Sequence, residues 1–249
     1  MFAYDPVLLA AAQMQPQSVA DALQTMAAID TACVDGDGLK WFNWLYRRVT
    51  QAVEARIAAV GFAEPAWLAE LDVQFARLYF GALASALRGQ TCPGCWQALF
   101  ERRNQAAITR IQFALAGINA HINHDLPQAI DATCEITKTT PQHNDQRYND
   151  YTTLNATLDR IIDTAKQELR VRLLGDALPA ASRLEDTLAA WSVSAAREAA
   201  WRNAEIFWNL RPVPALTANL MNTLDGLTTL ASKTLLVPVP GWTGPALSI

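Results

Sequence analysis

The sequence contains little glycine, few cysteines and no long uncharged apolar run. Glycine accounts for 11 of the 249 residues and cysteine for four. Four cysteines (Cys33, Cys92, Cys95 and Cys134) are too few to form a disulfide scaffold in a chain of this length. No stretch of 18 uncharged apolar residues occurs, so we expect no membrane-spanning helix.

Blocks of one charge sign are also missing. The formal net charge is -4, and both signs are spread along the chain, so nothing indicates a nucleic-acid partner or an acidic disordered tail. The apolar patch 7–12 follows Asp5 and has no Lys or Arg ahead of it, which argues against a signal peptide. We expect a soluble, cytoplasmic protein that binds neither nucleic acid nor membranes.

Several motifs of well-known enzyme families do not occur. The sequence has no phosphate-binding Gly-rich loop, no dinucleotide fingerprint and no nucleophile elbow. It also lacks an aspartate-rich motif for isoprenoid diphosphates and the Glu-x-x-His pairs of di-iron bundles. The sequence therefore predicts no cofactor.

Apolar residues recur instead at helical spacing through most of the chain. Hydrophobic residues make up 51% of the sequence, and strong helix formers dominate it. We predict an all-α fold, a single bundle of about eight to ten helices over residues 1–237, followed by a tail at 238–249. The expected helices cover about 39–57, 65–89, a short stretch from 96, 107–124, a stretch from 127, then 151–169, 184–210 and 216–235. We expect a loop at 139–149 and a break at 175–179.

The stretch 111–123 carries no formal charge and predicts a helix in the centre of the bundle. Gln112, Asn119 and Asn123 fall on one line of this helix. His121 and Asp125, one turn apart, fall on roughly the opposite side, with His124 adjacent. Packing alone seldom requires so many polar groups on one buried helix. A buried polar pocket around His121 is therefore expected.

Two other positions combine polar and apolar character. Asp72 lies within or beside an apolar stripe, and a buried carboxylate needs a cation, several donors, a metal or a proton. Arg197 and Trp201 lie one turn apart on a second helix that is apolar on two faces, so the guanidinium can lie on the indole face. Tryptophans at four positions could line a pocket for a hydrophobic molecule or could simply be core residues: Trp41, Trp44, Trp201 and Trp208.

Four segments carry a specific combination of residues: Asp37–Thr50, Leu71–Phe80, Gln112–Pro127 and Trp191–Ala204. Together they resemble DUF5995, a family of bacterial and fungal proteins of unknown function. The resemblance covers roughly residues 20–237, and the Asn-Ala-His-Ile-Asn string at 119–123 with Asp-Leu-Pro at 125–127 is its most specific part. It implies a shared helical fold and no particular reaction. The Cys-Pro-Gly-Cys turn at 92–95 and His124 lie outside the pattern.

The candidate site centres on His121. We predict His121 as an acid–base group or ligand and Asp125 as the group that orients it. Further predicted roles are hydrogen bonding to a substrate by Asn119 and Asn123 and pairing with an anion by Arg197. Asp72 and Trp201 are also predicted to bind the substrate. Asp72, Asn123, Asp150 or Glu205 could complete the site from facing helices. A core histidine whose nitrogens connect helices is the alternative.

Metal sites are expected to be absent. His121, His124, Cys92 and Cys95 imitate a Cys2His2 zinc set, but the histidine spacing is shorter than usual, and only one clear His–carboxylate pair occurs. Stoichiometric zinc or iron is therefore not predicted. The Cys-Pro-Gly-Cys turn lacks the strand–helix context of redox motifs and indicates a surface turn whose thiols can oxidise. Asp35-Gly36-Asp37-Gly38 lacks the later ligands of a calcium loop, which leaves a turn and helix cap.

Three hypotheses of function follow. The first is a protein that binds, or also transforms, a mainly apolar small molecule at His121. The second is a non-catalytic interaction or scaffold protein whose polar core serves fold specificity, and the third is a metal-dependent hydrolase. A cavity beside His121 would favour the first, a fully bonded core the second, and bound metal the third. The sequence does not indicate the oligomeric state.

Overall fold

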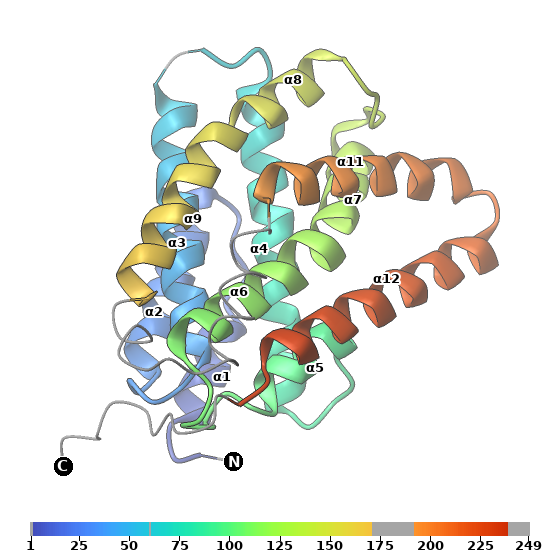
Figure 1. Ribbon diagram of the computed structural model, residues 1–249. Helices are drawn as coiled ribbons and strands as arrows, with labels where there is room; N and C mark the ends of the chain where they lie inside the picture. Colours follow the sequence, from blue (N-terminus) through green and yellow to red (C-terminus); the bar gives the residue numbers. More distant parts are fainter. Residues whose placement is uncertain (1, 60, 171–191, 239–249) are drawn as a thin grey trace.

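The computed structural model describes residues 2–59, 61–170 and 192–238. Within these ranges the regular structure is entirely helical, without a strand, which confirms the predicted all-α fold (Figure 1). The helices are α1 (Asp5–Ala12), α2 (Val19–Ala32), α3 (Leu39–Ala58), α4 (Pro65–Leu87), α5 (Gly94–Phe100), α6 (Arg110–Ala120), the π-helical turn η1 (His121–Asp125), α7 (Leu126–Thr137), α8 (Gln146–Thr153), α9 (Asn155–Arg170), α11 (Val193–Leu210) and α12 (Pro214–Leu235).

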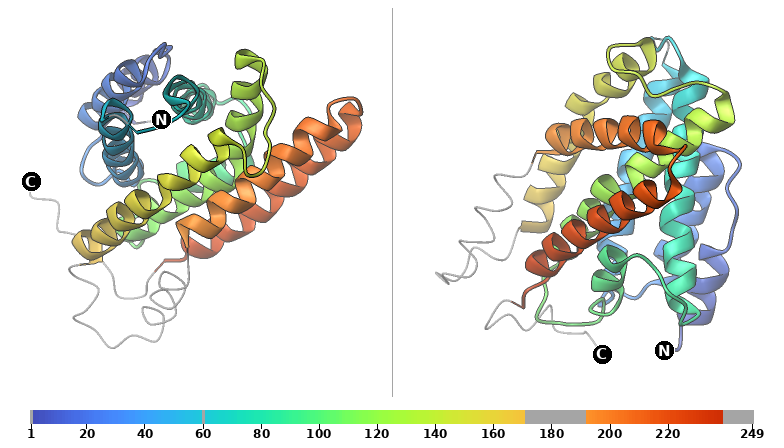
Figure 2. Two further views of the ribbon diagram at one scale, coloured as in Figure 1. Left: turned by 90° about the horizontal axis from the view of Figure 1, so that it is seen from above. Right: turned by 90° about the vertical axis from the view of Figure 1, so that its right-hand side faces the viewer.

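The continuous run α6–η1–α7 forms the centre of the molecule, as the charge-free sequence predicts. Figure 1 shows it crossing the picture diagonally, and the view from above in Figure 2 shows α3 and α4 on one side of it and α11 and α12 on the other. Helix α6 packs on α3 and α12, and α7 packs on α4 and α11. A capping box starts α6, because the Thr109 hydroxyl accepts the Gln112 N–H while the Gln112 side chain accepts the Thr109 N–H. Elements from both halves of the chain therefore meet on η1.

Helices α3 and α6 approach closely at a glycine. A Cβ atom at Gly117 would lie 2.3 Å from Cγ of Phe42, a distance that real side chains do not adopt. Phe42 is fully buried, so it has no free space to move into. The missing side chain at Gly117 thus sets the distance between the two helices and the position of the Phe42 ring.

Gly117→Ala should therefore destabilise the protein by about 1–3 kcal/mol, the usual effect of adding a methyl group to a packed core. The matched control is Gly81→Ala, because Gly81 also lies inside a helix but a Cβ there meets no atom within 4 Å. We expect this control to leave stability unchanged or to raise it by up to about 1 kcal/mol. Thermal melts of both variants beside the wild type measure the difference, and equal effects would contradict the packing argument.

The structure differs from the predicted helices in three places. Helices α1 and α2 were not predicted, although Ser18 caps α2 by accepting the Asp21 N–H. Helix α8 begins inside the expected 139–149 loop, where the Asp145 side chain accepts the Tyr148 N–H. A new helix was expected to start at Pro127, but the backbone continues from η1 into α7 without a break. The expected break at 175–179, the first part of the helix expected at 184–210 and the tail from 239 lie outside the described residues.

No helix in the described part of the chain is both long and apolar enough to cross a membrane.

Candidate functional site

His121, Asn123, His124 and Asp125 lie on the π-helical turn η1, whereas Gln112 and Asn119 lie on α6 before it. In this turn the N–H of Leu126 donates to the carbonyl of His121, five residues earlier, instead of four as in an α-helix. Such turns occur frequently at functional sites. Here the turn brings the side chains of His121, His124 and Asp125 into direct contact.

Asp125 accepts three hydrogen bonds inside the core. Its Oδ2 accepts from Nδ1 of His121 at 2.9 Å and from Nε1 of Trp96 at 2.9 Å, and its Oδ1 accepts from Nδ1 of His124 at 2.7 Å. Burial raises the pKa of Asp125, but the hydrogen bonds from the two histidines outweigh it and hold the pKa below its usual value. Since an ionised carboxylate only accepts, Nδ1 carries the proton in both rings. The predicted contact between His121 and Asp125 is thus present, and their acid–base role stays a prediction.

His121 lies among aromatic rings. The Phe75 ring stacks on it with a centroid distance of 3.4 Å and an interplanar angle of 5°, and Tyr46 meets it edge-on at 4.4 Å. Phe42, Tyr79 and Trp96 form the rest of the surroundings. Burial lowers the pKa of His121, which keeps the imidazole neutral. Its Nε2 is an acceptor with no hydrogen-bond partner among the described residues.

On α4, the helix that carries Phe75, another buried polar atom lacks a partner within the described ranges: Oδ2 of Asp72. Asp72 precedes Phe75 by about one turn of α4, and its charge contributes to raising the pKa of Tyr46, although burial contributes more. Burial, and secondly the charge of Glu54, raise the pKa of Asp72 to about 7. The prediction that Asp72 is a buried carboxylate is thereby confirmed, and proton uptake compensates its burial.

His124 takes part in a second cluster on the other side of Asp125. A ring nitrogen of His124, Sγ of Cys95 and a carboxylate oxygen of Asp225 all lie within 4.8 Å of one another. Asp225, on α12, also accepts the N–H groups of Gly94 and Cys95 at 2.9 and 3.0 Å. Burial lowers the pKa of His124, but the hydrogen bond and charge of Asp125 raise it further, so the net shift is upward. No local pattern in the sequence points to Asp225, which lies 100 residues beyond Asp125.

Comparison with known proteins gives one match. Residues 19–238 match the family of unknown function DUF5995. The chain belongs to DUF5995. No curated protein and no solved structure matches it. The matched part of this DUF5995 chain contains Asp72, Cys95, His121, Asp125 and Asp225, so both clusters lie within the family region.

Two of the amides predicted near the site connect α6 to α12 and to Val237 just beyond it, and a third supports one of them. The Gln112 amide donates to the carbonyls of Leu235 and Val237 at 2.7 Å each. The Asn119 amide donates to the carbonyl of Thr228 and the hydroxyl of Ser232 at 3.0 Å each, and Asn123 donates to Asn119 at 2.9 Å. These contacts hold the helices together. Substrate binding by Asn119 and Asn123 stays a prediction.

The remaining predicted residues belong to another cluster, between α8, α9 and α11. The Arg197 guanidinium lies over the Tyr151 ring at 3.8 Å, rather than on Trp201, and donates to the Tyr151 carbonyl and to Asn155. The Trp201 indole donates to Glu205. Asp150 accepts the N–H groups of residues 63 and 64 at the start of α4. The described contacts of His121 include none of these residues.

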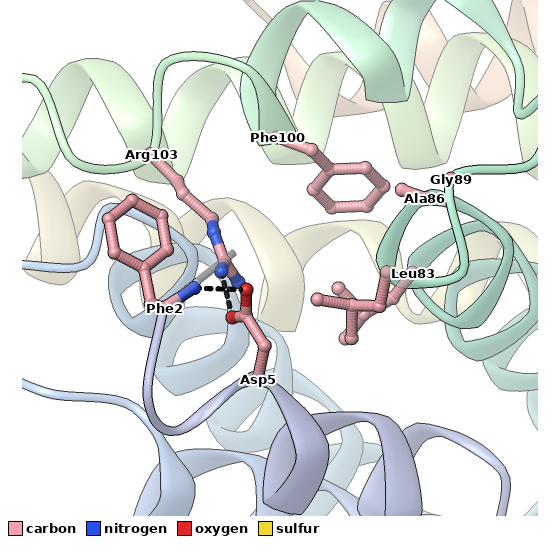
Figure 3. A pocket seen from close by; sticks show the side chains of 8 residues that line it. Phe2, Asp5, Leu83, Ala86, Gly89, Phe100 and Arg103 are labelled. Atoms are coloured by element: carbon pink, nitrogen blue, oxygen red, sulfur yellow. Dashed lines mark hydrogen bonds and ion pairs between the residues drawn. The ribbon is translucent and has the colours of Figure 1, made fainter.

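A pocket of about 290 Å³ lies away from His121, near the N-terminal residues. Figure 3 shows its lining side chains, with the buried ion pair of Asp5 and Arg103 at one end and apolar groups such as Leu83 and Phe100 at the other. The Phe100 ring stacks on Trp96, whose indole donates to Asp125. The ring stack of Phe100 and Trp96 therefore lies between this pocket and the His121 cluster.

Proposed function

We propose that this DUF5995 protein binds a mainly apolar small molecule next to His121 and that Nε2 of His121 accepts a hydrogen bond or a proton from it. One observation carries the proposal: Nε2 is buried, carries a lone pair and is unpaired among the described residues, in a side chain only 1% exposed. A buried acceptor without a partner costs about 1–3 kcal/mol, so stability alone does not favour it. A ligand that supplies one donor removes this cost.

The surroundings define the ligand class. Aromatic rings surround the imidazole, and Phe75, which stacks on its face, is itself partly exposed. Movement of this one ring opens a flat space between His121 and solvent. The preferred ligand is therefore a planar, ring-sized molecule with a single hydrogen-bond donor.

The same groups are suited to acid–base chemistry. Asp125 fixes the tautomer of His121 and stabilises the imidazolium that forms when Nε2 takes a proton. Asp72, with a pKa of about 7, holds a proton that it can donate near neutral pH. A ligand with an acidic group would thus meet a base and an acid in one buried site. The rival hypothesis is a scaffold protein, and the hydrogen bonds of Gln112 and Asn119 to α12 are the observation in its favour.

The test compares phenol with toluene, two rings of nearly equal size of which only phenol has a donor. We expect phenol to bind the wild type about tenfold more tightly, since one hydrogen bond contributes about 0.5–1.5 kcal/mol and 1.4 kcal/mol corresponds to tenfold. His121→Asn should remove this preference. The shorter Asn side chain can still donate to Asp125 through its NH₂ group, but no acceptor atom reaches the position of Nε2. Calorimetric titrations measure the four affinities.

The control variant is His143→Asn, since His143 is half-buried, contacts Glu198 and Glu205, and lies outside the His121 cluster. It should keep the preference for phenol. Equal affinities of the wild type for the two probes, or no binding of phenol at all, would contradict the proposal. A loss of several degrees in the melting temperature of His121→Asn, combined with no phenol binding, would establish the scaffold hypothesis instead.

A further inference from the structure

The second histidine of η1 belongs to a group of side chains typical of zinc ligands. Cys95 comes from α5, His124 from η1 and Asp225 from α12. Thiolate, imidazole and carboxylate are the ligand types that Zn²⁺ takes in proteins. Segments distant in sequence thus bring one ligand of each type together.

The spacing fits one ion. Ligand atoms of the three residues lie within 4.8 Å of one another, and a tetrahedral zinc with bonds of about 2.0–2.3 Å holds its ligands roughly 3.5 Å apart. Closing the group requires shifts of roughly 1 Å. Thr229 and the N–H groups of Gly94 and Cys95 hold the Asp225 carboxylate in place, and the Cys95 thiol also donates to it. An ion would replace the thiol proton between these two groups.

Asp125 prepares His124 for this role. Its Oδ1 accepts from Nδ1 of His124 at 2.7 Å, so Nε2 is the nitrogen that carries the lone pair. The Gln128 amide lies 3.4 Å from this Nε2 and donates at 2.8 Å to the His124 carbonyl, a bond it can keep when an ion takes the lone pair. A carboxylate behind a zinc-bound histidine is a common arrangement that fixes the ring and makes it a better ligand.

We infer that Cys95, His124 and Asp225 form a zinc site with three protein ligands and a fourth position open to water or a substrate atom. Cys95 binds as the thiolate, and its proton passes to solvent. Cys95 and His124 are buried whereas Asp225 is partly exposed, so an ion reaches the site from the side of α12. This inference is independent of the proposed ligand at His121, and it replaces our expectation from sequence spacing that no metal binds.

The experiment uses the full chain, stripped of metal with a chelator and then dialysed against Zn²⁺ or Co²⁺. We expect one ion per chain by elemental analysis. The Co²⁺ form should show the strong visible bands of tetrahedral coordination and a thiolate-to-cobalt charge-transfer band in the near ultraviolet. Cys95→Ser should abolish the charge-transfer band and weaken zinc binding by more than about 100-fold. Losing a residue that only supports a ligand typically weakens metal binding by about 10- to 100-fold, so a larger effect marks Cys95 as a ligand. His124→Asn and Asp225→Asn should weaken it similarly.

Two matched variants control for folding and for unspecific binding. Cys134→Ser removes another fully buried free thiol, and His143→Asn removes a histidine near two glutamates, so both should keep full zinc stoichiometry and the cobalt spectrum. If a ligand variant does not fold, the charge-transfer band of the wild type still identifies thiolate ligation. A wild type that binds less than one ion per chain, or a cobalt spectrum without a thiolate band, overturns the inference. Stoichiometric binding that survives Cys95→Ser overturns it equally.

Discussion

Replacing Asp125 with Asn should lower the free energy of unfolding by about 3 kcal/mol, since hydrogen bonds to a charged group contribute about 1.5–3 kcal/mol and a buried donor left without its acceptor costs about 1–3 kcal/mol. The carboxylate accepts from three donors, two imidazoles and one indole, and all are buried. An amide offers a single oxygen, and its NH₂ group faces a ring N–H. At least one donor therefore loses its acceptor, and the charge that stabilises the histidines disappears.

Urea unfolding of the wild type and Asp125→Asn, in the presence of EDTA, measures this difference without any contribution from zinc. Asp163→Asn is the control, because Asp163 is exposed on α9 and its contact with Lys166 is a surface pair. We expect less than about 0.5 kcal/mol from the control. A loss below 1 kcal/mol for Asp125→Asn would mean that the three hydrogen bonds contribute little to the native state.

Asp72→Asn should stabilise the protein, and the gain should depend on pH. The folded-state pKa of Asp72 is raised from 3.8 to about 7, so the unfolded chain releases this proton more readily than the folded one. Wild-type stability therefore falls as pH rises from about 4 to 7, and the loss is complete above pH 7. A shift from 3.8 to about 7 corresponds to roughly 4 kcal/mol, which the neutral amide avoids.

The difference in unfolding free energy between Asp72→Asn and the wild type should thus be largest at pH 8 and close to zero at pH 4. Urea titrations of both proteins across this range measure it. Glu54→Gln is an informative second variant, because the charge of Glu54 contributes to the raised pKa of Asp72. It should recover a smaller part of the gain, again only at the higher pH. A difference that is constant from pH 4 to pH 8 would show that Asp72 does not titrate in this window.

The sequence predicts the core of this structure well where composition and spacing agree. The charge-free stretch from Ile111 to Asn123 lies in the centre, Asp72 is buried, and His121 contacts Asp125 one turn later. Each of these follows from local periodicity, because residues three or four apart in a helix share a face. The membership in DUF5995 follows equally from the strings around Asp72 and His121.

What the sequence could not supply is contact between distant segments. The indole of Trp96 donates to Asp125 because α5 packs on α6. Asp225 lies beside His124 because α12 packs on α6 and on η1. Spacing along the chain carries no signal of this kind. The amides of Gln112 and Asn119 show the same limit. Helical periodicity predicts that they lie on one line of α6, but it does not predict that α12 accepts their hydrogen bonds.

The π-helical turn also acts as a phase shift between two helices. Successive residues rotate by about 100° around an α-helix, and a turn closed over five residues instead of four holds one residue more than the regular helix needs. If residues 121–125 were regular α-helix at the present length, α7 would be turned by about 100° about its axis, and its buried face, with Ile130 and Cys134, would no longer point at α4 and α11. The wide turn absorbs the additional residue instead. Deleting one residue from 121–125 would therefore let a regular helix run from α6 into α7 while α7 keeps nearly the same face toward its neighbours.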